Sequence, residues 1–211
     1  MDKKIHIEYG LSNFSMGYSD FDLKPVGSIS GINSGILECP SCHYANYDIE
    51  NSIEMRYANN VELWNKDNKI QAIINNYSDE LRKVLLVATQ YCNNGQYAKA
   101  YNLYITASWL TDKEEEINLF KSNANYLFLN YALPRYCKEI LQMVDVLRTT
   151  KQFDTSKRLL KATENFVKIM GDDPKDTIKP IDVMKAEKLF IRKKDSKTHN
   201  LGEIAKDKLK K

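Results

Sequence analysis

Residues 81–112 read LRKVLLVATQYCNNGQYAKAYNLYITASWLTD, and this stretch decides the fold of the chain. In each half, apolar residues recur at the three- and four-residue spacing of one helical face. The polar run Asn93-Asn94-Gly95-Gln96 separates the halves, and Gly95 can take the left-handed conformation that commonly ends a helix. Because neither helix could bury its apolar face alone, the pattern predicts an antiparallel helix-turn-helix hairpin.

The spacing inside this hairpin resembles the tetratricopeptide repeat. Small residues stand at Ala88, Ala100 and Ala107, where they allow the two helices to approach closely. Tyr91 stands at the aromatic position of the first helix, and Asp112 occupies the place of the final proline of the repeat. The resemblance implies a helical-repeat surface of the kind that commonly binds a protein or peptide partner.

Three tyrosines in the second helix of the hairpin are the candidate partner-binding residues: Tyr97, Tyr101 and Tyr104. Tyrosines on repeat faces mostly fill the core, but their amphipathic rings can also line a groove for an extended peptide. The sequence leaves both roles open for these residues.

A weaker copy of the pattern follows at residues 140–170, where Phe153, Ser156, Leu160 and Thr163 repeat the spacing of the second helix. The offset exceeds the roughly 34 residues of a regular array, because an additional helix intervenes near residues 115–136. One further helix is predicted over residues 181–192. The predicted fold is therefore mainly α, an irregular tetratricopeptide-like antiparallel helical repeat spanning residues 51–192.

Residues 1–50 have a different composition, with five of the eight glycines and short apolar runs bounded by turn residues. This pattern predicts a small ribbon-like β/loop subdomain, which is too small to form a sizeable core and must dock on the helices. Over residues 185–211, Lys and Arg outnumber Asp and Glu ten to four. We therefore expect residues 193–211 to form a basic, mobile tail.

Cys39-Pro40-Ser41-Cys42 is the motif that could carry chemistry. Two thiolates at this spacing can bind one face of a structural zinc ion, although a zinc ribbon normally uses two such pairs. His6 and His43 are the candidate additional ligands. One alternative is a degenerate ribbon that is held by packing. Another is a redox pair, which would need a helix N-terminus or a βαβ context that the sequence does not place before Cys39.

Three segments, YSDF at 18–21, GIN at 31–33 and CPSCHYA at 39–45, resemble the bacterial domain of unknown function 2225. The resemblance covers both parts of the chain, and it implies a two-knuckle zinc ribbon followed by tetratricopeptide-like helices. Where the family has its first Cys-x-x-Cys-Gly, this chain has the segment from His6 to Gly10. His43 stands where the family has glycine. The resemblance implies no known activity.

Composition excludes few classes of protein: the chain is 43% apolar and 28% charged, with a net charge of +3. No stretch approaches the roughly 18 apolar residues that would span a membrane, and no signal peptide is predicted at the N-terminus. The four cysteines lack the spacing of a secreted disulfide framework, which favours the cytoplasm. The sequence contains neither a phosphate-binding loop nor a His-Glu-x-x-His motif that would indicate an enzyme.

We therefore expect a non-enzymatic, cytoplasmic scaffold or protein-binding protein that presents a helical-repeat groove. Its richness in Asn, Lys, Ile and Tyr suits an AT-rich bacterial genome. The alternative is a zinc-ribbon nucleic-acid-binding protein that uses Cys39, Cys42 and the Lys-rich tail. A Cys-x-x-Cys redox protein is the second alternative.

Overall fold

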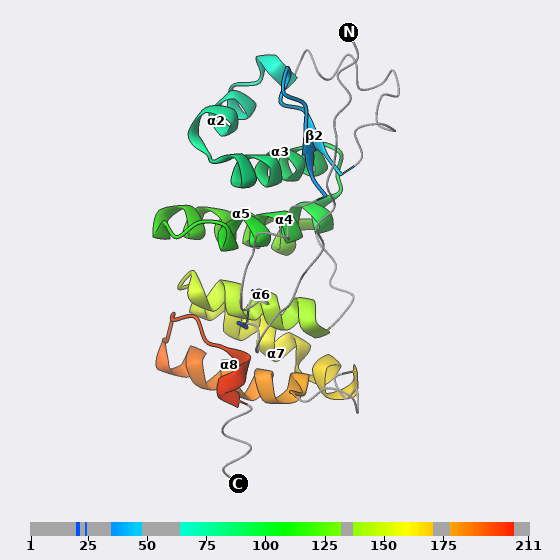
Figure 1. The fold of residues 1–211 in the computed structure, drawn as a ribbon. Helices are drawn as coiled ribbons and strands as arrows, with labels where there is room; N and C mark the ends of the chain where they lie inside the picture. Colours follow the sequence, from blue (N-terminus) through cyan, green and yellow to red (C-terminus); the bar gives the residue numbers. More distant parts are fainter. Residues whose placement is uncertain are drawn as a thin grey trace.

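The computed structural model describes residues 20–21, 24, 35–47, 64–131, 137–170 and 178–204. These residues form a mainly α structure with one small antiparallel sheet, as the sequence predicts (Figure 1). The elements are β1 (Leu37–Glu38), β2 (Ala45–Asn46), α2 (Asn68–Asn76), α3 (Asp79–Asn93), α4 (Tyr97–Trp109), α5 (Glu114–Tyr131), α6 (Cys137–Thr149), α7 (Phe153–Met170) and α8 (Pro180–Lys193).

The α3–α4 hairpin has the close packing that its small residues predict. Ala88, Ala100 and Ala107 are all fully buried between neighbouring helices. Gly95 takes a φ of +70°, and its backbone N–H donates to the carbonyl of Cys92 at 3.1 Å, which ends α3. The turn thus satisfies carbonyls at the end of the helix that would otherwise lack a partner.

The α6–α7 hairpin repeats this turn without a glycine. Lys151 takes the left-handed conformation with a φ of +63°, and its N–H donates to the carbonyl of Arg148. Gln152 then donates to Leu147 at 2.8 Å, as Gln96 donates to the carbonyl of Tyr91 at the same distance in the first hairpin. The second, weaker repeat in the sequence is therefore a true structural counterpart of the first.

Two hydrophobic cores run through the stack, and α6 belongs to both. The first core joins α2–α5 with the small sheet and takes Met143, Val146 and Leu147 from α6. The second joins α6, α7 and α8 and takes Val144 from the opposite side of α6. Because α6 faces both groups of helices, residues 140–148 are buried on every side of the helix, the polar ones among them included.

The ribbon-like hairpin β1–β2 docks on α3, as its small size requires. Arg82 donates to both carboxylate oxygens of Glu38, at 3.0 and 3.1 Å. The side chain of Gln90 donates to the carbonyl of Ala45 at 2.6 Å, and Ala45 itself is fully buried. These contacts hold the Cys39–Cys42 turn beside the N-terminal half of the helical stack.

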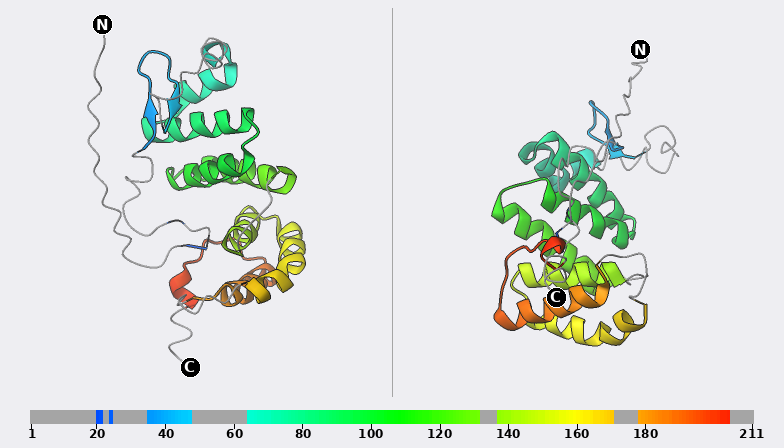
Figure 2. Two further views of the ribbon diagram at one scale, coloured as in Figure 1. Left: turned by 90° about the vertical axis from the view of Figure 1, so that its right-hand side faces the viewer. Right: turned by 60° about the horizontal axis from the view of Figure 1, so that its bottom comes forward.

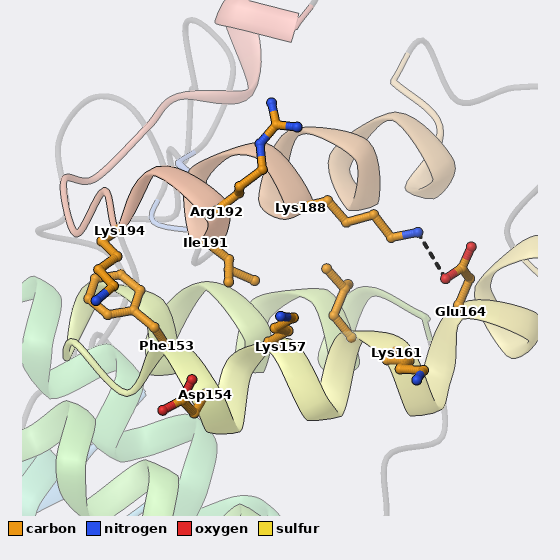
Figure 3. Close-up of a pocket in the computed structure, with 10 residues that line it drawn as sticks. Phe153, Asp154, Lys157, Lys161, Glu164, Lys188, Ile191, Arg192 and Lys194 are labelled. Carbon is orange, nitrogen blue, oxygen red and sulfur yellow. Dashed lines mark ion pairs between the residues drawn. The ribbon is translucent and has the colours of Figure 1, made fainter.

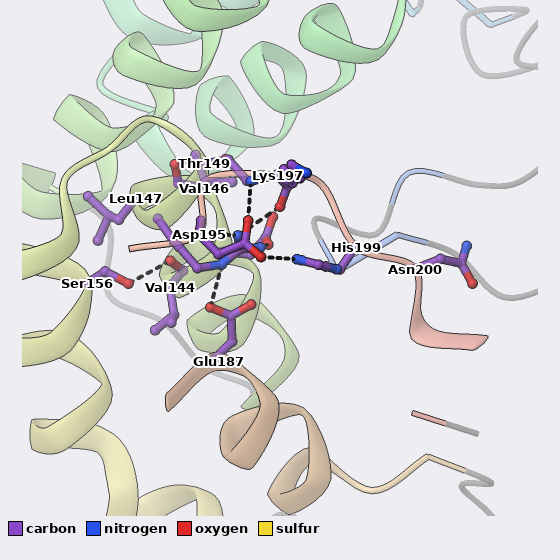
Figure 4. Close-up of polar contacts among 12 residues, drawn as sticks. Val144, Val146, Leu147, Thr149, Ser156, Glu187, Asp195, Lys197, His199 and Asn200 are labelled. Carbon is purple, nitrogen blue, oxygen red and sulfur yellow. Dashed lines mark hydrogen bonds and ion pairs between the residues drawn. The ribbon is translucent and has the colours of Figure 1, made fainter. Parts of the chain in front are cut away.

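Residues 194–204, which we call the C-terminal strap, lie within the predicted tail but pack against the helices. Arg148 of α6 is fully buried and donates to the carbonyls of Asp195 and Lys197 at 2.7 and 2.8 Å (Figure 4). The ring of His199 stacks on Phe190 of α8, with 3.9 Å between ring centroids. The packed chain therefore extends past Lys193, because the strap supplies acceptors that a buried guanidinium needs.

The same guanidinium is held by two buried carboxylates. Its Nε donates to Glu187 of α8 at 3.0 Å, and its Nη2 donates to Asp145 one helical turn earlier on α6. Burial, with the Asp145 carboxylate as the second cause, raises the pKa of Glu187 to about 8. We call Asp145, Arg148 and Glu187 the buried charge cluster.

The strap also holds the first described residues of the chain. The N–H of Phe21 donates to the carbonyl of His199 at 3.1 Å, and the side chain of Asn200 donates to Asp20 at 3.3 Å. Phe21 is buried in the second core. Figure 2 shows the short blue segment at residues 20–21 beside the strap, which is drawn in orange and red.

Candidate functional site: the cysteine turn and the exposed face of α5

Cys39 and Cys42 lie on one tight turn between β1 and β2. The N–H of Cys39 donates to the carbonyl of Tyr44 at 2.8 Å, and the N–H of His43 donates back to Cys39 at 2.9 Å. His43 takes a φ of +56°, a conformation that favours glycine. The turn thus brings the two predicted thiol ligands together at the cost of backbone strain at His43.

The side chain of His43 is engaged by the ribbon itself. Its Nδ1 lies 2.6 Å from Glu38 Oε1, in a contact that also includes Arg82. Among the described residues, no group of three or more His, Cys, Asp and Glu side chains is placed to hold a metal ion. His6 lies outside the described residues, so the complete ligand set of a zinc site stays a prediction.

The two thiols of the turn differ chemically. The backbone N–H of Ser41 lowers the pKa of the Cys39 thiol, whereas burial raises the pKa of Cys42. Cys39 is therefore the better nucleophile of the pair. All four cysteines of the chain are free thiols in the structure.

The three predicted partner-binding tyrosines separate into two groups. Tyr101 and Tyr104 are 3% and 5% exposed, so they are core residues and cannot line a groove, which corrects that interpretation. Burial raises the pKa of Tyr104 to about 12, and the hydroxyl of Tyr101 donates to Gln142 of α6. Only Tyr97 reaches the surface, where its ring stacks on Tyr131 with 4.2 Å between centroids.

Tyr97 joins an exposed apolar surface on α5. Leu119, Tyr126, Leu129 and Tyr131 are each between 49% and 58% exposed. We call these four side chains the α5 face. Leu119, Tyr126 and Leu129 follow one another at the spacing of a single helical face, and Tyr126 packs edge-on against Tyr131 at the end of the helix. In Figure 1, α5 lies across the middle of the stack.

Little charge lies along the α5 face, although its N-terminal end borders acidic residues, with exposed Glu115 one turn before Leu119. From residue 117 to residue 131 the only ionisable groups with a charge at neutral pH belong to Lys121, which is buried and 5% exposed. The polar residues exposed beside the face are Asn118, Ser122 and Asn130. A stretch of helix whose one charged side chain is buried stands out in a chain that is 28% charged.

The sequence indicated the buried side of α5 but not this exposed one. Phe120, Ala124, Leu127 and Phe128 form the buried inner stripe, whereas Tyr131, which continues its spacing, is 49% exposed at the end of the helix. The missed signal was a second apolar stripe at Leu119, Tyr126 and Leu129. A surface helix needs one apolar side for the core, so a second one calls for a separate partner.

Comparisons with known protein families, curated proteins and solved structures found no match for this chain. The resemblance to the bacterial domain of unknown function 2225 therefore stays a prediction. None of the helices in the described part of the chain is both long and apolar enough to cross a bilayer.

Proposed function

We propose that this chain is a non-enzymatic, cytoplasmic adaptor that binds a protein partner through the α5 face. The observation that carries the proposal is the group of four half-exposed Leu and Tyr side chains on α5, between residues 119 and 131, where the one charged residue, Lys121, is buried. Aromatic residues are enriched, and charged residues depleted, at the centres of protein–protein interfaces. The four free thiols support a reducing compartment such as the cytoplasm.

The chemistry of the surface defines its partner. The exposed Leu and Tyr side chains of the α5 face favour an apolar surface, such as one side of an amphipathic helix. The stacked rings of Tyr97 and Tyr131 provide a rigid platform at the end of the face. Rigid aromatic side chains lose little conformational entropy on binding, which makes them effective interface anchors.

Charge introduced on the α5 face tests this function. Tyr126→Lys places a charge at the centre of the face, and Ile169→Lys on α7 is the matched control, because Ile169 is 79% exposed outside it. The wild-type chain and the control should crosslink to the same partner in cells, and Tyr126→Lys should lose it. Equal crosslinking by all three proteins would refute the proposal.

Light scattering of the same purified proteins tests whether the partner is a second copy of this chain. If the wild-type chain and Ile169→Lys are dimers and Tyr126→Lys is a monomer, the α5 face binds a second copy of this chain. If all three are monomers, the partner is a different protein.

A further inference from the structure

A cleft between α7 and α8 has no role in the proposed adaptor function. Its volume is about 560 Å³, within the range of pockets that hold small molecules. Figure 3 shows α7 residues along one edge and α8 residues along the other, with Ile191 projecting between the helices. Leu160 and Phe153 of α7 complete the apolar part of the lining.

Basic side chains dominate the edges of this cleft. Lys157, Lys161, Arg192 and Lys194 all line it. Within the described residues none of these four forms an ion pair. In a folded protein such uncompensated like charges repel one another, and an anion that enters the cleft relieves the repulsion.

The acidic residues of the cleft do little to offset this charge. Glu164 already accepts from Lys168 and Lys188, at 2.8 Å in both pairs, and these contacts lower its pKa to about 2. Asp154 is the other acidic residue of the lining. The local field of the cleft is therefore positive over an apolar floor.

We propose that the α7–α8 cleft binds a small anionic amphiphile, an apolar group that carries a phosphate or a carboxylate. The apolar group lies against Leu160 and Ile191, which are 2% and 7% exposed, and the anion lies among the basic side chains. Long lysine and arginine side chains can keep their apolar stems along such a floor while their charged ends reach the headgroup. An apolar ligand without charge would leave the positive field unmatched, and a bare anion would leave the space between the two helices unfilled.

Calorimetric titration with matched probes tests both halves of this inference. Octyl phosphate, below its micelle concentration, should bind, whereas octyl glucoside and octyl trimethylammonium should not. Butyl phosphate should bind more weakly than octyl phosphate, because it buries fewer methylenes. Equal binding of octyl glucoside would overturn the electrostatic reasoning, and equal binding of inorganic phosphate would overturn the role of the floor.

Variants place the binding in the cleft. Lys157→Gln/Arg192→Gln should weaken octyl phosphate binding about fivefold, the combined effect of two partly exposed charge contacts. The matched control is Lys138→Gln/Lys185→Gln, which removes two exposed lysines outside the cleft. An equal loss in both variants would show a non-specific charge effect and overturn the assignment. Binding only to vesicles that contain phosphatidic acid, or only to an acidic peptide, would overturn it as well.

The α5 face is untouched by these substitutions, so this result does not depend on the adaptor function.

Discussion

Replacing Arg148 by methionine should destabilise the protein severely, because its fully buried guanidinium satisfies four acceptors. It donates to Asp145, to Glu187 at 3.0 Å, and to two strap carbonyls at 2.7 and 2.8 Å. Arg148→Met leaves the buried carboxyl groups of Asp145 and Glu187 without the cation that donates to them. Removing one partner of a buried ion pair costs about 3–5 kcal/mol, against a total stability of about 5–15 kcal/mol for a protein domain.

Urea denaturation followed by circular dichroism measures this loss as a change in the free energy of unfolding. The triple variant Arg148→Met/Asp145→Asn/Glu187→Gln is the matched comparison, because it removes both carboxyl groups together with the cation. It should recover part of the lost stability. The reasoning is wrong if Arg148→Met alone lies within about 1 kcal/mol of the wild type, the range of an exposed ion pair.

Three further predictions follow from the described geometry. The pKa of Glu187 is raised to about 8 by burial, so the folded state retains a proton that the unfolded state loses near the ordinary value of 4.5. Wild-type stability relative to Glu187→Gln should therefore fall as pH rises from about 5 to about 8 and stay level above that; a constant difference across this window in urea titrations would contradict the raised pKa. Gly95→Ala should cost about 1 kcal/mol of stability through its φ of +70° alone, since no atom lies within 4 Å of the added methyl. Lys151→Gly at the equivalent turn should stabilise the fold by up to about 1 kcal/mol. Thermal melts in which both variants shift the melting temperature in the same direction would count against the shared turn geometry. Iodoacetamide should alkylate Cys39 before Cys42 and Cys137, whose thiol pKa values are raised by burial. Peptide mapping that finds Cys42 modified first would disprove the lower thiol pKa of Cys39.

The helical hairpins could be predicted because their signals are local. Spacing, small residues and turn chemistry lie within a few positions of one another, and Ala88 and Ala100 are buried for the reason that the sequence indicates. The second turn was harder to recognise, because Lys151 takes the conformation for which Gly95 is better suited. There, hydrogen bonds to the end of α6 and the packing around them override local preference.

The candidate surfaces were harder to predict, because they depend on contacts between distant segments. Tyr101 and Tyr104 share a helix with Tyr97, and only the position of α5 and α6 decides which of the three is exposed. The basic residues of the cleft come from two helices and from the first residue of the strap. The run of charges at the end of the chain predicts a solvated tail. The buried side chain of Arg148 instead donates hydrogen bonds to two backbone carbonyls of that run.

The contact between Asn200 and Asp20 can form only late in synthesis, because 180 residues separate the two. Phe21 is part of the second core, which also packs against Leu201 and Ile204. A ribosome that adds about 5–20 residues per second needs roughly 10–40 s between these segments. The contacts between α3 and α4 join residues that are close in sequence, so this hairpin can form during that interval. Phe21 can be buried only after its partners near the C-terminus have been synthesised. Closure of the second core is therefore a late step with a high contact order.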